Sequence, residues 1–237
     1  MIRIGDRALA ALRRSRGRAE VLAPLSRSTY FLAAGRLIWL GVPGQPLHPR
    51  AILSDALPAP ESLAALAPWK PRQPRRTDGL REAAKRLRPR LATLGPPRGL
   101  GALLFGKRPA FPLHQAGAAL RALPRSAPAL LGLGPGLTPS GDDAVGGFLF
   151  ARRLLGRKPP RRLLALARRR TTRISAVLLA DHAMGRSFEP LHELALALAE
   201  GREDAALAAA RRLVAIGHSS GWDMLTGFMR GVGAWGR

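Results

Sequence analysis

The chain has 237 residues, 46% of them hydrophobic and none of them cysteine. This is enough apolar material for a buried core, and it excludes disulfide scaffolds, thiolate nucleophiles and Cys-ligated metals. The formal net charge is +24, and nearly all the positive charge comes from arginine. We interpret this charge as a basic surface spread over the whole molecule. Aromatic residues make up only 5% of the chain, too few for the stacking platforms of a nucleic-acid binder.

In chain order, the N-terminus from Met1 to Arg7 lacks the apolar segment of a signal peptide, and no run approaches the ~20 apolar residues of a membrane span. We therefore expect a cytoplasmic protein with no membrane contact. Residues 1–66 carry short alternating apolar segments cut by glycine and proline, which predict a small β-rich part with a hairpin near Ala34-Gly35. Residues 67–76 are rich in proline and basic side chains and predict a linker or surface loop.

Residues 77–237 are predicted to form a mainly helical domain, in which Gly95 to Pro112 is loop-rich. Prolines at first turns and glycines just beyond last turns mark the helix ends. The expected helices cover 77–88, 113–123, 142–155, 160–170, 171–185, 190–199, 203–216 and 220–232. The predicted fold class is α+β, a small β part followed by a larger helical bundle.

Two segments of the helical part share the pattern Ser-Gly-x-Asp-x-x-x-Gly-Phe, one beginning at Ser140 and the other at Ser220. In each, the serine stands where an N-cap is expected, and an aspartate three residues on completes a capping box. Gly147 and Gly227 occupy equivalent positions and favour a close crossing of the two helices. That crossing is expected to bring the two N-termini to one ligand pocket.

The segment before the first motif is a glycine-rich loop followed by a helix start, and it is the strongest local signal in the chain. Gly134 and Gly136 allow the backbone to approach a ligand closely, Thr138 and Ser140 add hydroxyls, and Gly141 follows at the helix start. Such a loop presents N–H groups to an anion. It is neither a P-loop, which needs Lys-Ser/Thr, nor a dinucleotide fingerprint.

Asp142 and Asp143 are adjacent acids in a cationic chain. Asp143 is interpreted either as the capping acid or as a catalytic group. Asp142 is interpreted as facing the loop cavity, where it would hold Mg²⁺, a substrate amide or a proton; its alternative is a surface acid favoured by the helix dipole. Mg²⁺, held by Asp142 or Asp143, is the one candidate cofactor. On this hypothesis, replacing Asp142 by alanine abolishes activity and leaves the melting temperature nearly unchanged.

The second motif is preceded by His218 and Ser219, and it continues through Ser220 to Asp223. His218 is a candidate to move a proton or to bond a substrate, with a purely structural role as the alternative. Ser219, Ser220 and Asp223 are candidate substrate contacts.

A third candidate is the predicted helix 171–185, on which Thr172, Ser175, Leu179 and His182 share one face. Hydroxyls on that face suggest a helix that lines a polar cavity, with Thr172 and Ser175 as substrate contacts. The alternative is ordinary packing, with hydroxyls bonded to the preceding turn. Asp181-His182 is a poor metal pair, because adjacent residues diverge on a helix.

The run from Gly132 to Asp143, together with Thr171 to Ser175 and Gly217 to Gly221, resembles the AllH-like family, over about residues 130–232. The resemblance implies one subunit of oxamate carbamoyltransferase, which works beside other subunits in purine (allantoin) breakdown. There, oxalurate and phosphate are interconverted with oxamate and carbamoyl phosphate. An older description of such proteins is carboxylase.

The function predicted from residues and resemblance together is a carbamoyltransferase subunit that binds a small anionic substrate at two helix N-termini. Asp142, Asp143 and His218 are its candidate catalytic residues. Phosphate, carbamoyl phosphate or an oxalurate-like anion, and other protein subunits, are the expected partners. The alternatives are a noncatalytic assembly subunit and, third, a nucleic-acid-binding protein.

Overall fold

The computed structural model describes residues 2–235, which divide into two compact units, residues 2–71 and 72–235. The first unit is a five-stranded sheet in the order β1-β5-β4-β3-β2, antiparallel except for the parallel pair β4 and β5. Its elements are β1 Arg3–Ile4, α1 Asp6–Ser15, β2 Glu20–Pro24, β3 Ser28–Ala33, β4 Arg36–Gly41, β5 Ala51–Leu53 and the 3₁₀ helix η1 Pro60–Ala64.

The hairpin between β3 and β4 turns at Ala34 and Gly35, which have φ of 47° and 71°. Both central residues are left-handed, as a two-residue hairpin turn requires, and the turn lies where the sequence predicts it. Helix α1 was missed, because its arginines conceal the stripe of Ala8, Leu9 and Leu12 that packs in the core of this unit.

The second unit is helical. Its elements are α2 Leu80–Arg90, η2 Leu91–Leu94, η3 Gly99–Phe105, η4 Leu113–Gln115, α3 Ala116–Arg121, α4 Ala127–Leu130, α5 Ser140–Leu154, α6 Arg161–Arg170, α7 Arg173–Ala183, α8 Glu189–Ala199, α9 Glu203–Val214 and α10 Ser220–Gly231. A sheet followed by a helical unit confirms the predicted α+β class. The sequence missed α4 and the 3₁₀ helix η3, which lies in the region predicted as loop.

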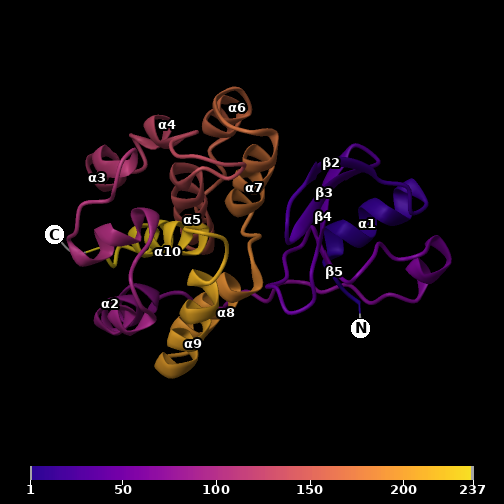
Figure 1. Cartoon of the computed structure of the whole chain (residues 1–237). Helices are drawn as coiled ribbons and strands as arrows, with labels where there is room; N and C mark the ends of the chain where they lie inside the picture. Colours follow the sequence, from indigo (N-terminus) through magenta and orange to yellow (C-terminus); the bar gives the residue numbers. More distant parts are fainter. Residues whose placement is uncertain (1, 236–237) are drawn as a thin grey trace. The chain divides into compact units, whose positions relative to one another are not determined.

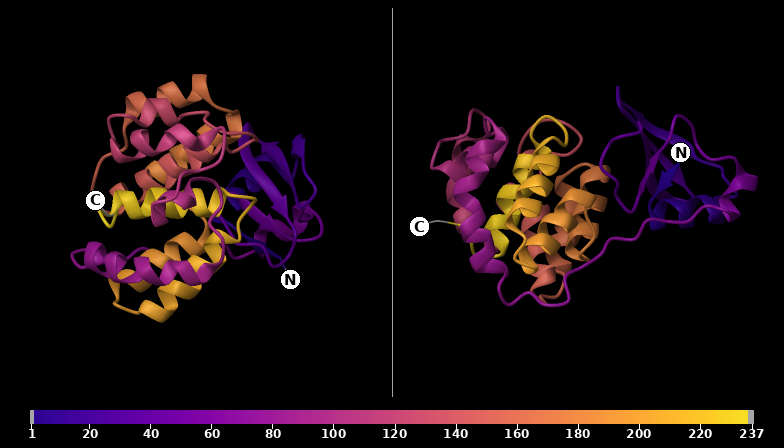
Figure 2. Two further views of the ribbon diagram at one scale, coloured as in Figure 1. Left: turned by 60° about the vertical axis from the view of Figure 1, so that its left-hand side comes forward. Right: turned by 90° about the horizontal axis from the view of Figure 1, so that it is seen from below.

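Helices α5 and α10 form the centre of the second unit (Figure 1). Helix α10 runs between a group made of α3, α4, α6 and α7 and a group made of α2, α8 and α9, an order that the left view of Figure 2 repeats. Each group has its own apolar cluster, and α5 contributes to both: Phe148 to the first and Phe150 to the second. The central pair is therefore fixed from two sides.

Three glycines allow α5 and α10 to touch backbone to backbone. A Cβ on Gly147 would stand 2.0 Å from the carbonyl oxygen of Met224, and a Cβ on Gly227 would stand 1.8 Å from that of Ala144. One turn further along, a Cβ on Gly231 would lie 2.8 Å from the carbonyl oxygen of Phe148. The two helices are parallel, since the contact of Gly227 with Ala144 is followed one turn later, along both helices, by the contact of Gly231 with Phe148. The close crossing predicted from the paired glycines is confirmed.

Candidate functional site at the paired helix N-termini

The N-termini of α5 and α10 lie side by side. Ser140 Oγ is 3.3 Å from Ser219 Oγ, and Thr138 Oγ1 is 3.4 Å from Ser220 Oγ. Ser140 is buried, whereas the other three residues are half-buried. Four hydroxyls therefore gather at two helix ends whose first N–H groups have no acceptor within their own helix. The expected convergence of the two motifs is present in the structure.

Neither serine motif is a capping box. The N-cap of α5 is Pro139 and that of α10 is Ser219, and neither end has a side-chain cap hydrogen bond. The capping prediction is therefore wrong. Its physical reason is that the serines face the partner helix instead of their own first turn: Ser220 lies beside Asp143 and Ser140 beside Asp223, near enough for each hydroxyl to lower the pKa of that carboxyl.

These exchanged pairs give the site a local two-fold pattern. Superposing the first motif on the second places Ser140 on Ser220 and Asp143 on Asp223. Each serine then lies beside the aspartate of the other motif, just as each glycine of the crossing lies against a carbonyl group of the other helix. The repeated sequence pattern thus describes one two-sided site.

Asp143 and Asp223 are buried carboxyls. Burial is the main cause that raises the pKa of Asp143 well above its ordinary value, and the neighbouring charges of Asp223 and Asp142 raise it further. Burial likewise raises the pKa of Asp223 to about 6, against the lowering effect of hydrogen bonds from the Leu100 N–H and from Ser219 and Ser140. Both groups are thereby poised to hold a proton nearer neutrality than ordinary aspartates.

Asp142 has a structural duty that the sequence did not reveal. Its Oδ1 accepts the Gly132 N–H at 3.0 Å, and its Oδ2 accepts the hydroxyls of Ser175, at 2.8 Å, and of Thr171. Burial raises its pKa in spite of these hydrogen bonds. The carboxyl fastens the glycine loop to the start of α7, and the hypothesis that Asp142 faces an open cavity is not supported by this geometry.

The glycine-rich loop is held open in the conformation that its glycines permit. Gly134 and Gly136 have φ of 115° and 89°, and nothing lies within 4 Å of a Cβ placed on Gly136. Gly141, inside the helix start, donates its N–H to the Leu133 carbonyl at 2.8 Å. A Cβ on Gly141 would stand 2.1 Å from the Leu130 carbonyl oxygen, so this glycine is required for packing and not for ligand contact.

Helix α7 supports the loop through hydrogen bonds at its first turn. Thr172 caps α7 by accepting the Ser175 N–H at 3.0 Å, and its hydroxyl donates to the Leu137 carbonyl at 2.5 Å. Ser175, Leu179 and His182 are all buried. His182 packs against Gly146 of α5, where a Cβ would lie 2.6 Å from the ring, and burial lowers its pKa to about 4. This face is therefore packed, but its hydroxyls bond to Leu137 and Asp142 and not to the preceding turn, so the packing alternative is correct only in part.

His218 is exposed in the turn before α10, and its carbonyl oxygen accepts a bond from Arg98 at 3.3 Å. It directly precedes Ser219 and Ser220 in the chain. Sequence reasoning missed the part played by η3. The Leu100 N–H reaches Asp223 Oδ1 at 2.6 Å, and a Cβ on the preceding Gly99 would lie 2.4 Å from that oxygen. Only Gly99, at φ +54°, hints at this contact.

Metal binding has no cluster to support it. Within residues 2–235, no three His, Asp or Glu side chains are grouped closely enough to hold a metal ion. Asp142 has both oxygens occupied by protein donors. We assign no metal ligand in the described part of the chain, and Mg²⁺ remains a prediction.

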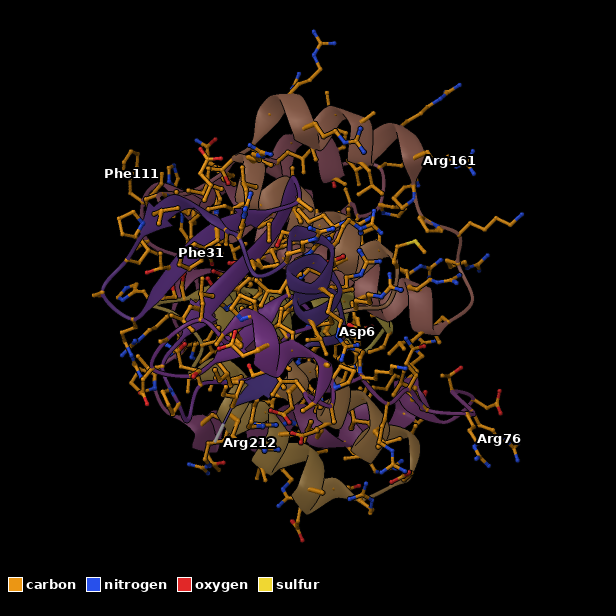
Figure 3. The ribbon with its side chains drawn as sticks, turned by 90° about the vertical axis from the view of Figure 1, so that its right-hand side faces the viewer. Asp6, Phe31, Arg76, Phe111, Arg161 and Arg212 are labelled. Carbon is orange, nitrogen blue, oxygen red and sulfur yellow. The ribbon has the colours of Figure 1, made fainter. Side chains whose placement is uncertain are left out.

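A basic groove lies elsewhere in the helical unit. A groove of about 750 Å³ is lined by Arg72, Arg75, Arg76 and Arg202, beside the end of α8. Arg76 pairs with Asp78 and Arg202 with Glu200. Figure 3 shows the side chains of Arg76 and Arg161 extending away from the ribbon. The groove is a competing place for anions in any binding experiment.

Fold and geometry together define an α+β chain whose helical unit carries hydroxyls and buried carboxyls at two adjacent helix N-termini. Residues 130–232, less than half of the chain, match the family described as oxamate carbamoyltransferase subunit AllH. The resemblance predicted from the motifs is thereby confirmed for this segment, which includes the whole site except the η3 contact. No curated protein and no solved structure matches the chain. Among the helices of residues 2–235, none combines the length and apolar character needed to cross a membrane.

Proposed function

We propose that the chain is a subunit of a carbamoyltransferase and binds a small anion, such as phosphate, carbamoyl phosphate or an oxalurate-like carboxylate, at the paired N-termini of α5 and α10. The single observation that carries this proposal is the meeting of four hydroxyls, from Thr138, Ser140, Ser219 and Ser220, at two parallel helix ends. Two helix dipoles direct their positive ends to that place, and hydroxyls and N–H groups are the donors that oxyanions require. The family match supports the carbamoyl chemistry.

Within this site, the backbone of Gly134 and Gly136 closes over the anion from the loop side. Asp143 and Asp223 lie behind the hydroxyls, and His218, exposed beside them, moves a proton or polarises the substrate carbonyl. Asp142, Thr172 and Ser175 have inward hydrogen bonds only, so we propose them as supports of the loop instead of substrate contacts.

Calorimetric titration of the full chain with inorganic phosphate and with carbamoyl phosphate tests this proposal. The double variant Thr138→Val and Ser219→Ala, which removes two half-buried hydroxyls, should weaken binding at least about tenfold, the cost of losing about 1.4 kcal/mol of donor contacts. The matched control, Arg72→Gln and Arg75→Gln in the competing groove, should retain the affinity. Loss of binding in the groove control alone would contradict the proposal.

The second candidate is a noncatalytic assembly subunit, and specific surface features favour it. Phe111 is 86% exposed, and Figure 3 labels it at the edge of the molecule. An apolar groove of about 320 Å³ between α4, α5 and α6 is lined by Phe148, Leu149 and Leu163, with Arg125 and Arg162 among its lining residues. Such surfaces suit contacts with other subunits. Co-purification of partner subunits with an isolated chain that binds no phosphate would support this candidate.

A further inference from the structure

Two chains of hydroxyl groups run from the surface of the proposed anion site to buried carboxyls. One passes from Thr138 Oγ1 to Ser220 Oγ, which lies beside Asp143; the other passes from Ser219 Oγ to Ser140 Oγ, which lies beside Asp223. In both hydroxyl–hydroxyl contacts, either oxygen can be the donor. The direction of each chain is therefore set by the carboxyl at its end.

The inner ends of the chains are inaccessible to solvent. Asp143 Oδ2 and Asp223 Oδ2 are fully buried and receive no well-aligned hydrogen bond from any of the described residues. Asp223 as a whole is 0% exposed and Asp143 is 7% exposed. Water cannot reorganise around these oxygens, so the serine hydroxyls beside them must reorient when the carboxyls gain or lose a proton.

An ionised carboxylate only accepts hydrogen bonds. Next to it, Ser220 or Ser140 must turn its O–H inward, which leaves hydroxyl lone pairs facing the site and repels an oxyanion. A protonated carboxyl donates its own O–H to the serine oxygen. The serine O–H is then free to point outward, or to donate to the hydroxyl of Thr138 or Ser219, whose own O–H then points outward. The site thereby presents hydrogen-bond donors to an anion.

Few other charges face these carboxyls. Asp142 is the neighbouring acid on α5, and it is tied to the loop and to α7. From η3 the Leu100 N–H contacts Asp223, and just before η3 Arg98 reaches the His218 carbonyl oxygen. The glycine-rich loop from 131 to 139 has no charged residue. His218 directly precedes Ser219 and carries an imidazole, so its contribution must be tested separately.

We propose that Asp143 and Asp223 are positioning residues that set the direction of the serine hydroxyls, so that an oxyanion enters the site together with a proton. The inference rests on the proposed function and adds its regulation: anion affinity rises as the carboxyls become protonated. The raised pKa values of both groups place this switch closer to neutral pH than ordinary aspartates would.

Sulfate is the probe, because it is an oxyanion whose own charge does not change between about pH 5 and 8, the range over which the switch is examined. Calorimetry with the full chain, in a constant chloride background that suppresses weak surface binding, should show affinity that falls toward higher pH. The limiting slope is about tenfold per pH unit for one proton taken up. Repeating the wild-type titration in two buffers of different ionisation heat measures proton uptake directly, without any variant.

The isosteric variants Asp143→Asn and Asp223→Asn carry an amide that donates permanently, so each should bind sulfate with a flatter pH profile and with no loss of affinity at high pH. Asp204→Asn, an exposed acid on α9, is the matched control and should keep the wild-type slope. If the wild-type chain binds sulfate without taking up a proton, this inference is overturned and the proposed function still stands. A flat profile in His218→Gln with an unchanged slope in both Asn variants would also overturn it. Absence of sulfate binding at every pH would overturn the proposed function as well.

Discussion

The N-terminal turns of α5 and α10 share one sequence pattern but are fixed to the molecule by opposite kinds of contact. In α5 the third motif position is Asp142, whose carboxyl fastens the start of α7 and the glycine loop. In α10 the same position is Trp222, which is 3% exposed and packs edge to face against Phe105 with ring centroids 6.0 Å apart.

The difference shows which motif positions belong to the site and which to the surroundings. Serine, aspartate and glycine are repeated because each makes its contact across the pair, while the third position faces away toward whatever element lies on that side. At this third position, the carboxylate of Asp142 accepts hydrogen bonds from the polar loop, and the ring of Trp222 packs against the 3₁₀ helix η3. The shared residues are therefore the better guide to function.

The largest expected effect comes from adding a methyl group to the crossing. Gly147→Ala and Gly227→Ala each place a Cβ about 2 Å from a backbone carbonyl oxygen that has no room to move. We expect each to lower the free energy of unfolding by about 3 kcal/mol or more, as measured by urea denaturation. If only one of the two is destabilising, the two-sided description of the pair fails.

Gly79→Ala is the matched control for these two variants, because nothing lies within 4 Å of its Cβ and its φ is −86°. It should change the free energy of unfolding by less than about 0.5 kcal/mol.

The second largest effect is expected at the third motif position of α5, which is Asp142. Asp142→Ala removes the acceptor of the Gly132 N–H and of two hydroxyls, so we expect a loss of about 2–3 kcal/mol in the free energy of unfolding. This replaces the expectation of an unchanged melting temperature. Scanning calorimetry that finds wild-type stability in this variant would return Asp142 to the list of catalytic candidates.

A pH experiment tests the raised pKa of Asp223, one of the two buried acids of the site. Because the pKa of Asp223 is raised to about 6 in the folded chain, this group stabilises the fold below its ordinary pKa and loses that contribution as pH rises to about 6. Asp223→Asn should therefore be more stable than wild type at pH 7, by up to ~2 kcal/mol, and nearly equal at pH 4. Chemical denaturation at both pH values measures the difference, and a variant less stable at pH 7 would contradict it.

The smallest expected effect concerns the cap of α7. Thr172→Ala removes an N-cap bond and a bond to the Leu137 carbonyl and should cost about 1 kcal/mol. Thr172→Ser keeps the hydroxyl and should retain most of the stability. Equal losses in the two variants, measured by thermal unfolding, would show that the methyl group matters and the cap does not.

The sequence alone was sufficient for the fold class, the β3–β4 hairpin and the close helix crossing, because each depends on local residue types: turn residues with positive φ, or glycines at matching positions. It was insufficient for hydrogen bonds across elements. Ser140 looks the same in sequence whether it caps its own helix or bonds Asp223 of another, and only the register of the two helices decides.

Asp142 illustrates the same limit. Its three donors come from Gly132, Thr171 and Ser175, which are separated along the chain and meet only after α7 packs on α5. The Leu100 contact with Asp223 spans a still longer interval, and its neighbour Gly99 lies in a stretch that reads as loop. Long-range polar contacts of this kind carry no periodic signal in a single sequence.

The most direct test of the central claim is a crystal structure of the full chain soaked with selenate, whose anomalous signal marks the anion. The account predicts a peak within hydrogen-bond distance of the hydroxyls of Thr138, Ser219 and Ser220, at the ends of α5 and α10. A peak confined to the arginine groove beside α8, with none at the paired helix ends, would contradict it.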